Sequence, residues 1–232
     1  MSENIATGEL RDGQTFQVNY LTIDDLPFIM KLQKKVENAL SSSTILEPLS
    51  EEEFTGILSG DRLMIGVFVE GEMIAFRAMR NPELDAEHLG IDAGLSEDDL
   101  PKVIYQEIST IDPDFQGNGL QNYMGEIVMK IIDNKHFRYV FATVAPFNIP
   151  SLKDKLKLGL EIVALKEKYG GKLRYIFMKD LAASKSKRVC NEKSFVKMSE
   201  IVEQQKFMGA GFMGISIKEV GDEWYVQYCR VQ

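Results

Sequence analysis

An amphipathic helix that directly follows a strand and a glycine-containing turn is the strongest pattern in this sequence. Over residues 119–133 the apolar side chains recur at the spacing of a helix with one buried face. They are Leu120, Tyr123, Met124, Ile127, Val128 and Ile131. Residues 103–111, before the turn, have the pattern of a strand. A strand, a turn and a helix in this order are typical of α/β proteins.

The rest of the sequence predicts strands, hairpins and short helices around this element. Strands are expected at 16–21 and 139–144, and hairpins at 62–69 with 73–78, 162–168 with 173–179, and 214–218 with 223–230. Helices are expected after the caps Thr22 and Ser50, and over 151–158 and 200–208. A loop is expected at 41–43 and a linker at 182–187. This order indicates a mixed α/β sheet.

The charge and hydropathy of the chain exclude several classes of protein. Its 232 residues carry 27 basic and 35 acidic side chains, a formal net charge of −8. An acidic balance argues against nucleic-acid binding, because affinity for phosphate backbones comes mainly from Lys and Arg. No stretch approaches the roughly 18 uninterrupted apolar residues of a membrane-spanning helix, and residues 1–14 lack the features of a secretion signal. We expect a cytoplasmic protein that binds neither nucleic acid nor membrane.

The cysteines and histidines show no metal-binding spacing. Cys190 and Cys229 are the only cysteines, and no other ligand type is suitably spaced from either. His88 and His136 stand outside any HExxH pattern. We therefore expect no metal site, and we expect both cysteines to be reduced thiols.

The turn before the amphipathic helix has the chemistry of an anion-binding site. Gly117 and Gly119 let the backbone approach an anionic group, and the first N–H groups of a helix bind phosphate oxygens. Asn-Gly is also a common hairpin turn, but the helical period begins at Leu120, so the turn leads into a helix. The Walker loop and the dinucleotide fingerprint require other spacings. The turn therefore predicts a site for pyrophosphate.

These residues resemble motif A of the GNAT superfamily of acyl-CoA-dependent N-acetyltransferases. In that motif, Gln or Arg is followed by two variable residues, a Gly, one variable residue and then Gly or Ala. Gln116 and Gly119 match the first two fixed positions, and Gln121 departs from the third. Asn148, Ser151 and Gly159 are similar to motif B. The resemblance covers about residues 16–181 and implies a mixed, centrally splayed β-sheet flanked by helices.

The remaining residues, 182–232, are expected to form a C-terminal extension with a linker, a short helix and a β-hairpin. This segment holds 8 basic and 6 acidic side chains, so it is +2 and residues 1–181 are −10. The hairpin residues Trp224, Val226 and Tyr228 alternate. They have three open interpretations: a cap over the acceptor pocket, a homodimer surface, or burial against the main domain.

The resemblance implies acetyl-CoA as a cosubstrate and assigns residues to it. Backbone groups near Thr110 and Ile111 would contact pantetheine, and the N–H near Ile111 would polarise the thioester carbonyl. Asn148 and Ser151 of motif B would also contact the cosubstrate. The pyrophosphate would be held by the backbone amides of Gln116, Gly117, Asn118, Gly119, Leu120 and Gln121.

The expected reaction is direct transfer of the acetyl group to a primary amine of a small molecule or peptide. A free alkylamine has a pKa of about 10.4, so a base is useful, and Glu107 is the candidate. It lies four residues before Ile111, on the same face if the strand alternates regularly. The alternative is a strand glutamate that faces solvent or pairs with a cation.

Two further features leave alternatives open. Lys155 stands where the family commonly has a tyrosine that protonates the CoA thiolate; a solvated lysine is expected there, with proton donation as the alternative. The seven acidic residues between Glu83 and Asp99 either attract a cationic amine or form a solvated loop. Lys155 and Gln121 also motivate a second function, a sensor or interaction module that binds CoA without turnover.

Overall fold

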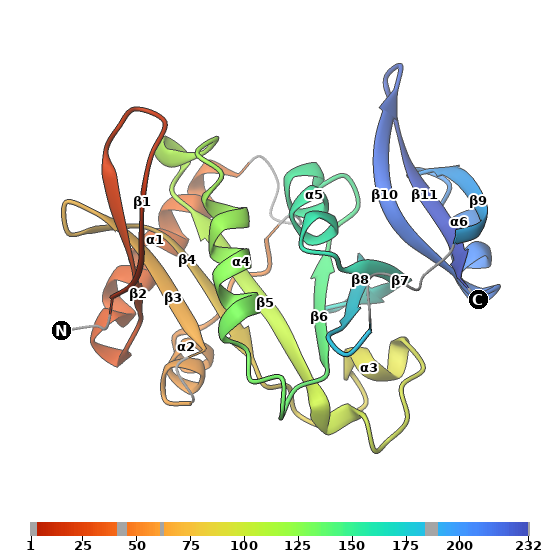
Figure 1. The fold of residues 1–232 in the computed structure, drawn as a ribbon, viewed down its shortest axis with the longest axis horizontal. Coiled ribbons are helices and arrows are strands. Elements are labelled where there is room, and N and C mark those ends of the chain that lie inside the picture. Colours follow the sequence, from red (N-terminus) through yellow and green to blue (C-terminus); the bar gives the residue numbers. More distant parts are fainter. Residues whose placement is uncertain (1–3, 41–45, 61–62, 184–189, 232) are drawn as a thin grey trace. The chain divides into compact units, whose positions relative to one another are not determined.

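The computed structural model describes residues 4–40, 46–60, 63–183 and 190–231. The chain divides into two compact units (Figure 1). The first unit comprises Met1–Arg80 and Gln106–Ile132, and the second comprises Asn81–Tyr105 and Asp133–Gln232. Strand β5 (Val103–Ile111) belongs to both, because the division falls between Tyr105 and Gln106.

The first unit is a sheet covered by helices. Its strands follow the order β1 (Asn4–Glu9), β2 (Thr15–Tyr20), β3 (Met64–Val69), β4 (Glu72–Arg80) and the later part of β5. Its helices are α1 (Leu26–Ala39), α2 (Glu51–Leu58) and α4 (Leu120–Ile131), with 3-10 turns η1 (Ile23–Asp25) and η3 (Pro113–Phe115). One core cluster joins α1 and α2 to Phe76 and Ala78 of β4.

Side-chain caps fix where the early helices begin. Ser50 Oγ accepts the N–H of Glu53 at 3.2 Å, and the Glu53 carboxylate accepts the N–H of Ser50 at 2.8 Å. At the start of η1, the Asp25 carboxylate accepts the N–H of Thr22 at 2.8 Å, and the N–H of Asp25 donates to the carbonyl of Thr22 at 3.0 Å. Both pairs satisfy N–H groups that a helix start leaves free, as the sequence predicts.

The second unit is also built on a sheet. Its strand order is the start of β5, then β6 (Tyr139–Val144), β8 (Lys172–Asp180), β7 (Glu161–Lys168), β10 (Phe212–Val220), β11 (Glu223–Val231) and β9 (Cys190–Lys197). β5 and β6 are parallel and the other pairs are antiparallel. The helices are α3 (Leu89–Asp92), α5 (Ile149–Lys157) and α6 (Ile201–Gly209), with the 3-10 turn η2 (Leu100–Lys102).

A buried glutamine joins the C-terminal residues to the rest of the second unit. Gln204 of α6 accepts hydrogen bonds from the hydroxyls of Tyr175 on β8 (2.6 Å) and Tyr228 on β11 (3.0 Å). Its amide nitrogen donates to the carbonyl of Met198 at 2.8 Å. Val226 and Tyr228 are fully buried, so these two hairpin side chains pack inside the unit. A domain boundary at residue 181 stays a prediction.

The expected mixed α/β class is confirmed, and most elements lie within two residues of their predicted bounds. β1, β9 and α3 were not predicted. β1 and β9 are edge strands with mostly exposed or half-exposed residues, so neither carries a clear alternation of apolar side chains. The predicted loop at 41–43, Arg62 and most of the predicted linker lie outside the described residues.

The expectation of reduced cysteines is wrong. Cys190 and Cys229 form a disulfide, with their Cα atoms 5.7 Å apart. β9 pairs with β11 in a register that places Lys193 opposite Cys229 and Cys190 opposite Val231. The sequence did not reveal β9, so nothing in it placed the two cysteines side by side.

Two searches of the described residues gave negative results. No group of three or more His, Cys, Asp or Glu side chains in the described part of the chain is arranged to hold a metal ion. No helix among those residues is long and apolar enough to cross a membrane.

Candidate functional site

The turn between β5 and α4 presents glycine backbone beside open space. Gly117 and Gly119 have φ angles of +80° and +76°, in the left-handed region that glycine adopts without strain. A Cβ atom built at either position would meet no atom within 4 Å. The turn therefore leaves room for a ligand to approach the main chain.

No side-chain cap satisfies the N–H donors at the start of α4. Gly119 is the N-cap, it supplies no side-chain cap, and the first turn of the helix contains no acidic residue. Uncapped N–H groups and the helix dipole together favour an anion at this position. The residues present thus fit a pyrophosphate, as the sequence predicts for 116–121.

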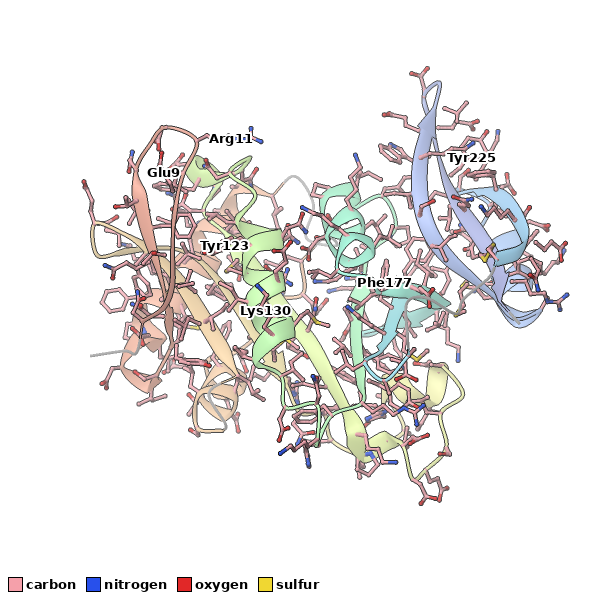
Figure 2. The ribbon with its side chains drawn as sticks, viewed as in Figure 1. Glu9, Arg11, Tyr123, Lys130, Phe177 and Tyr225 are labelled. Atoms are coloured by element: carbon pink, nitrogen blue, oxygen red, sulfur yellow. A yellow bond between two sulfur atoms is a disulfide. The ribbon has the colours of Figure 1, made fainter. Side chains whose placement is uncertain are left out.

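An N-terminal hairpin braces this turn. The Asn118 side chain accepts the N–H of Arg11 at 3.0 Å and donates to the carbonyl of Phe115 at 3.0 Å. The Tyr123 hydroxyl of α4 donates to the carbonyl of Thr7 at 2.8 Å. Figure 2 labels Arg11 in the β1–β2 hairpin and Tyr123 on α4. The Asn118 side chain therefore holds the turn in shape, which leaves its backbone N–H as the group for a ligand.

β5 does not alternate regularly around Glu107. The Gln106 amide donates to Sδ of Met129 on α4 at 3.5 Å, so Gln106 faces α4. Ile108 belongs to the cluster that contains Phe54 of α2, so it faces the opposite side of the sheet. Residues two apart in a regular strand share a face. The strand is therefore irregular here, as at a β-bulge.

Glu107 lies on the α1/α2 face of the sheet. Its carboxylate is 3.6 Å from the guanidinium of Arg80, which is 3.7 Å from Glu53 of α2. The Glu107 side chain is only 15% exposed. Burial raises the pKa of Glu107, and the nearby Arg80 lowers it by less, so the pKa stays above the usual range for glutamate.

The expectation that Glu107 and Ile111 share a face is wrong. Counting from Ile108, Thr110 falls on the α1/α2 face and Ile111 on the α4 face. Asp112, the next residue, bonds to Lys35 of α1, which agrees with this assignment. The irregularity near Glu107 reverses the alternation, and no sequence pattern marks it.

Two hydroxyls of β5 have no partner. The side-chain oxygens of Ser109 and Thr110 are buried and make no hydrogen bond with any described residue. A buried hydroxyl without a partner is costly, so these atoms suit a position that a bound ligand completes. Thr110 was predicted to contact the cosubstrate, and Ser109 was not.

The motif B residues shape the two ends of α5 in the second unit. The Asn148 side chain accepts the N–H of Ser151 at 3.4 Å and so caps the helix. Gly159, with φ of +80°, follows the helix end. The structure thus brings Glu107, Thr110, Ile111 and the turn together in the first unit, and it places Asn148 and Ser151 in the second.

Solved structures share this architecture. No protein-family profile and no curated protein matches the sequence. A GNAT-family acetyltransferase of Listeria monocytogenes 4b F2365 is 18% identical, with a TM-score of 0.55 over 77% of this chain and 100% of its own. The PaiA N-acetyltransferase of Thermoplasma acidophilum, solved with coenzyme A, is 14% identical, with a TM-score of 0.52 over 71% and 98%. Salmonella typhimurium yncA, solved with acetyl-CoA, is 11% identical, with a TM-score of 0.55 over 75% and 99%.

This chain has the GNAT acetyltransferase fold. The fold that the two motifs predicted is therefore confirmed. Within the GNAT fold, β5 and β6 have the bounds that the sequence predicted, and α4 begins one residue after its predicted start.

The environment of Lys155 in this GNAT fold differs from the expected one. Its side chain is 7% exposed, and its ammonium lies 3.1 Å from the carboxylate of Asp154, which is 2% exposed. The expectation of a solvated lysine is wrong because Lys155 lies on the buried side of α5, a helix that packs against both β6 and β10. The sequence did not show the contact between α5 and β10.

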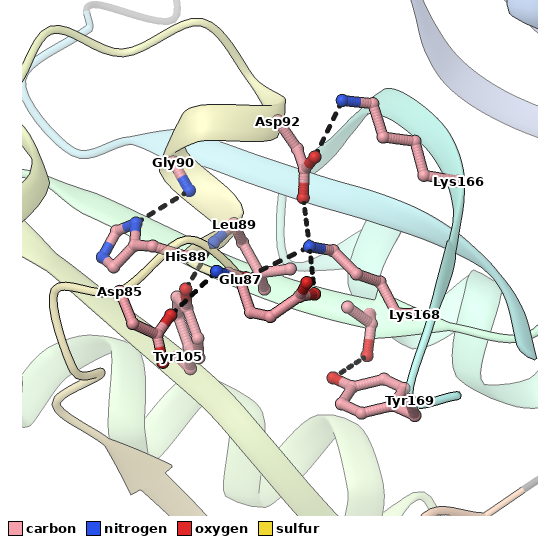
Figure 3. A network of polar contacts seen from close by, with 11 residues as sticks. Asp85, Glu87, His88, Leu89, Gly90, Asp92, Tyr105, Lys166, Lys168 and Tyr169 are labelled. Carbon is pink, nitrogen blue, oxygen red and sulfur yellow. Dashed lines mark hydrogen bonds and ion pairs between the residues drawn. The ribbon is translucent and has the colours of Figure 1, made fainter. Parts of the chain in front are cut away.

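The acidic segment 83–99 is more ordered than a solvated loop. It contains α3, and Lys168 of β7 reaches it with its ammonium 2.7 Å from Asp92 and 3.1 Å from Glu87 (Figure 3). Burial lowers the pKa of Lys168, but the hydrogen bonds to Asp92 and Glu87 outweigh it, so the pKa is raised. Asp92 and Glu87 are thus engaged by a lysine of the chain itself.

Proposed function

We propose that this chain is an acetyl-CoA-dependent N-acetyltransferase that acts on a primary amine of a small molecule or peptide. The observation that carries the proposal is the uncapped N-terminus of α4 behind two glycines of positive φ, on a GNAT fold. Anion binding by main-chain N–H groups explains how a chain of net charge −8 would take a polyanionic cosubstrate.

Each predicted residue has a role in this proposal. The backbone amides of 116–121 hold the pyrophosphate, and β5 contacts pantetheine near Thr110 and Ile111, with the N–H near Ile111 as a donor to the thioester carbonyl. Asn148 and Ser151 remain candidates for contact with the cosubstrate. Acetyl-CoA supplies the activated acetyl group when bound.

Proton removal from the amine is assigned to Glu107, through water. Glu107 shares the α1/α2 face with Thr110 and not with Ile111, and three residues of extended chain span about 10 Å, so Glu107 would reach an amine at that end of β5 only through water. Its raised pKa makes it a stronger base than an ordinary glutamate. As the amine nitrogen bonds to the acyl carbon, the carbon–sulfur bond breaks and the nitrogen loses a proton. A thiol has a pKa of about 8.5, so the thiolate can leave without a dedicated acid.

A second candidate function is a module that binds CoA without turnover. It is favoured by Lys155, which replaces the expected tyrosine and is already paired with Asp154. Gln121 at the third fixed position of motif A also favours it, because its side chain adds bulk beside the proposed phosphates.

Calorimetry and turnover separate these candidates. Isothermal titration with CoA and acetyl-CoA is expected to show binding, and a panel of amines should include an acceptor that releases CoA thiol. Binding without release on any amine would favour the second candidate. If the protein bound neither CoA nor acetyl-CoA, both candidate functions would be overturned.

A pair of glycine variants tests the position of the pyrophosphate. Gly119→Glu adds a carboxylate where the anion is proposed and is expected to weaken CoA binding more than tenfold. Gly71→Glu in the β3–β4 hairpin is the matched control, because Gly71 also has positive φ and open space around it. Equal affinities in both variants would contradict the assignment.

The cytoplasm is the location that we propose for this activity. Disulfides are rare there, so the Cys190–Cys229 pair offers a test. Alkylation of a fresh cell extract followed by mass spectrometry measures whether this pair is oxidised in the cell. An oxidised pair in the extract would argue for an oxidising compartment.

A further inference from the structure

Strands β9, β11 and β10 of the second unit form a small sheet that α6 covers on one face. The Tyr228 hydroxyl of β11 donates to Gln204 of α6 at 3.0 Å, so Tyr228 lies on that face. Val226 is two residues away on β11 and shares the face, and Val196 of β9 is its partner in the register; both valines are buried. The residues between these positions in each strand therefore lie on the opposite face, which we call the outer face.

Side-chain contacts on the outer face agree with this assignment. The Ser216 hydroxyl of β10 donates to the Gln227 side chain of β11 at 2.7 Å. The Lys218 ammonium of β10 lies 3.5 Å from the centre of the Phe195 ring of β9. The outer face includes Lys193, Phe195 and Lys197 of β9, Glu223, Tyr225 and Gln227 of β11, and Ser216 and Lys218 of β10.

The outer face presents two aromatic rings on neighbouring strands. Phe195 is 44% exposed, and Tyr225, which is labelled in Figure 2, is half-buried. Phe195 pairs in the register with Gln227, which is two residues from Tyr225, so the two aromatic residues are diagonal neighbours about 7–8 Å apart. Phe195 and Tyr225 together form an aromatic platform that solvent reaches.

The strands place more lysines than acidic residues on the outer face. Glu223 is acidic and pairs with Lys197 at 2.7 Å. The other acidic residues in the described parts of these strands, Glu192 and Glu219, fall on the α6 face by the same register. The lysines of the outer face are Lys193, Lys197 and Lys218. The net charge of −8, on which the expectation of no nucleic-acid binding rests, therefore does not describe this face.

Aromatic rings and cations side by side on an exposed sheet face fit one class of ligand well. Unpaired bases stack on aromatic side chains, and the phosphates between them bind lysines. An acidic peptide would engage the lysines alone and would leave the two rings without a matching group. Single-stranded nucleic acid supplies a partner for both kinds of side chain.

We propose that the outer face binds single-stranded nucleic acid. Bases stack on Phe195 and Tyr225, and phosphates contact the three lysines. The Lys218 ammonium now lies over the Phe195 ring, and a stacking base would displace it from the ring and leave it to pair with a phosphate. This binding activity goes beyond the proposed acetyl transfer and does not depend on it.

Fluorescence anisotropy with labelled oligothymidine and oligouridine of about 12 nucleotides tests the proposal. The variants are Phe195→Ala and Tyr225→Ala, which remove the rings, and Tyr225→Phe, which keeps the ring and removes the hydroxyl. Phe28→Ala is the matched control, because Phe28 is 56% exposed on α1 in the first unit. Polyglutamate is the competing polyanion without bases. A melting temperature for each variant checks that it is folded.

We expect the wild-type protein to bind at least one oligonucleotide, which identifies DNA or RNA as the ligand. Each alanine variant on the outer face should bind about tenfold more weakly, whereas Tyr225→Phe and Phe28→Ala should bind as the wild type does. Raising the salt concentration from about 50 to about 200 mM should weaken binding roughly tenfold. The proposal would be overturned by wild-type protein that binds neither oligonucleotide, by equal affinity for polyglutamate, or by unchanged affinity in both folded alanine variants.

Discussion

The ammonium of Lys35 on α1 lies 2.7 Å from the carboxylate of Asp112, which follows β5 just before the proposed pyrophosphate turn. The same ammonium is 2.7 Å from Asp114. The Asp112 carboxylate also accepts the N–H of Asp114 at 3.0 Å, and its own N–H donates to Ile74 at 2.8 Å. Lys35 thus anchors the chain where it leaves the sheet and neutralises two carboxylates near the proposed anion.

Lys35→Met is therefore expected to weaken CoA binding several-fold. The melting temperature should also fall, because the Asp112 side chain is only 10% exposed and loses its cationic partner. Lys34→Met is the matched control, since Lys34 is exposed on the same helix and pairs only locally with Glu37. Calorimetry measures the Kd for CoA in each variant. An equal loss of CoA affinity in both variants would show that the net charge of the protein, and not the position of Lys35, determines the effect.

Glu107→Gln is expected to lower kcat at least tenfold and to leave the Kd for CoA unchanged. Because the pKa of Glu107 is raised, the wild-type rate should increase as pH rises through that pKa and this dependence should disappear in the variant. A pH–rate profile with any amine found to be an acceptor gives the measurement. Glu53→Gln, which removes the other carboxylate beside Arg80, serves as the control. Retained kcat in Glu107→Gln would exclude Glu107 as the base.

Stability should depend on the protonation of His88. Burial lowers the pKa of His88, the charge of Asp85 raises it by less, and the charge of Lys168 lowers it further. The Nδ1 atom of His88 accepts the N–H of Gly90 at 3.0 Å. The folded chain thus prefers neutral His88, whereas the unfolded chain binds a proton near its ordinary pKa of about 6.5. The free energy of unfolding should therefore fall as pH falls below about 6.5. Urea titrations between pH 8 and 5 measure it, and His88→Asn should reduce the slope.

Replacement of Gln204 should destabilise the second unit. Gln204→Leu leaves the hydroxyls of Tyr175 and Tyr228 and the carbonyl of Met198 buried without this partner, which costs about 1–3 kcal/mol. Gln205→Leu is the control, because Gln205 is exposed and makes one side-chain bond to Leu165. Equal denaturation midpoints for the two variants would show that the buried network contributes little.

The elements with strong periodicity were predictable and the contacts between distant residues were not. Local spacing was sufficient to place α4 and its glycine turn, and β5 and β6 were predicted at their observed bounds. Lys155 is buried because β10 packs on α5, and Cys190 meets Cys229 because β9 pairs with β11. The burial of Lys155 and the disulfide both depend on contacts between residues more than thirty positions apart in the sequence. The irregularity beside Glu107 has no sequence signal, although it decides the face on which that carboxylate lies.

The shared strand β5 also constrains how this chain is made. The first unit needs Gln106–Ile132, and it cannot be completed until Ile132 has left the ribosome. By then Asn81–Tyr105 of the second unit has already been synthesised. Neither unit is a continuous segment, so no single truncation or gene fusion would deliver one of them whole.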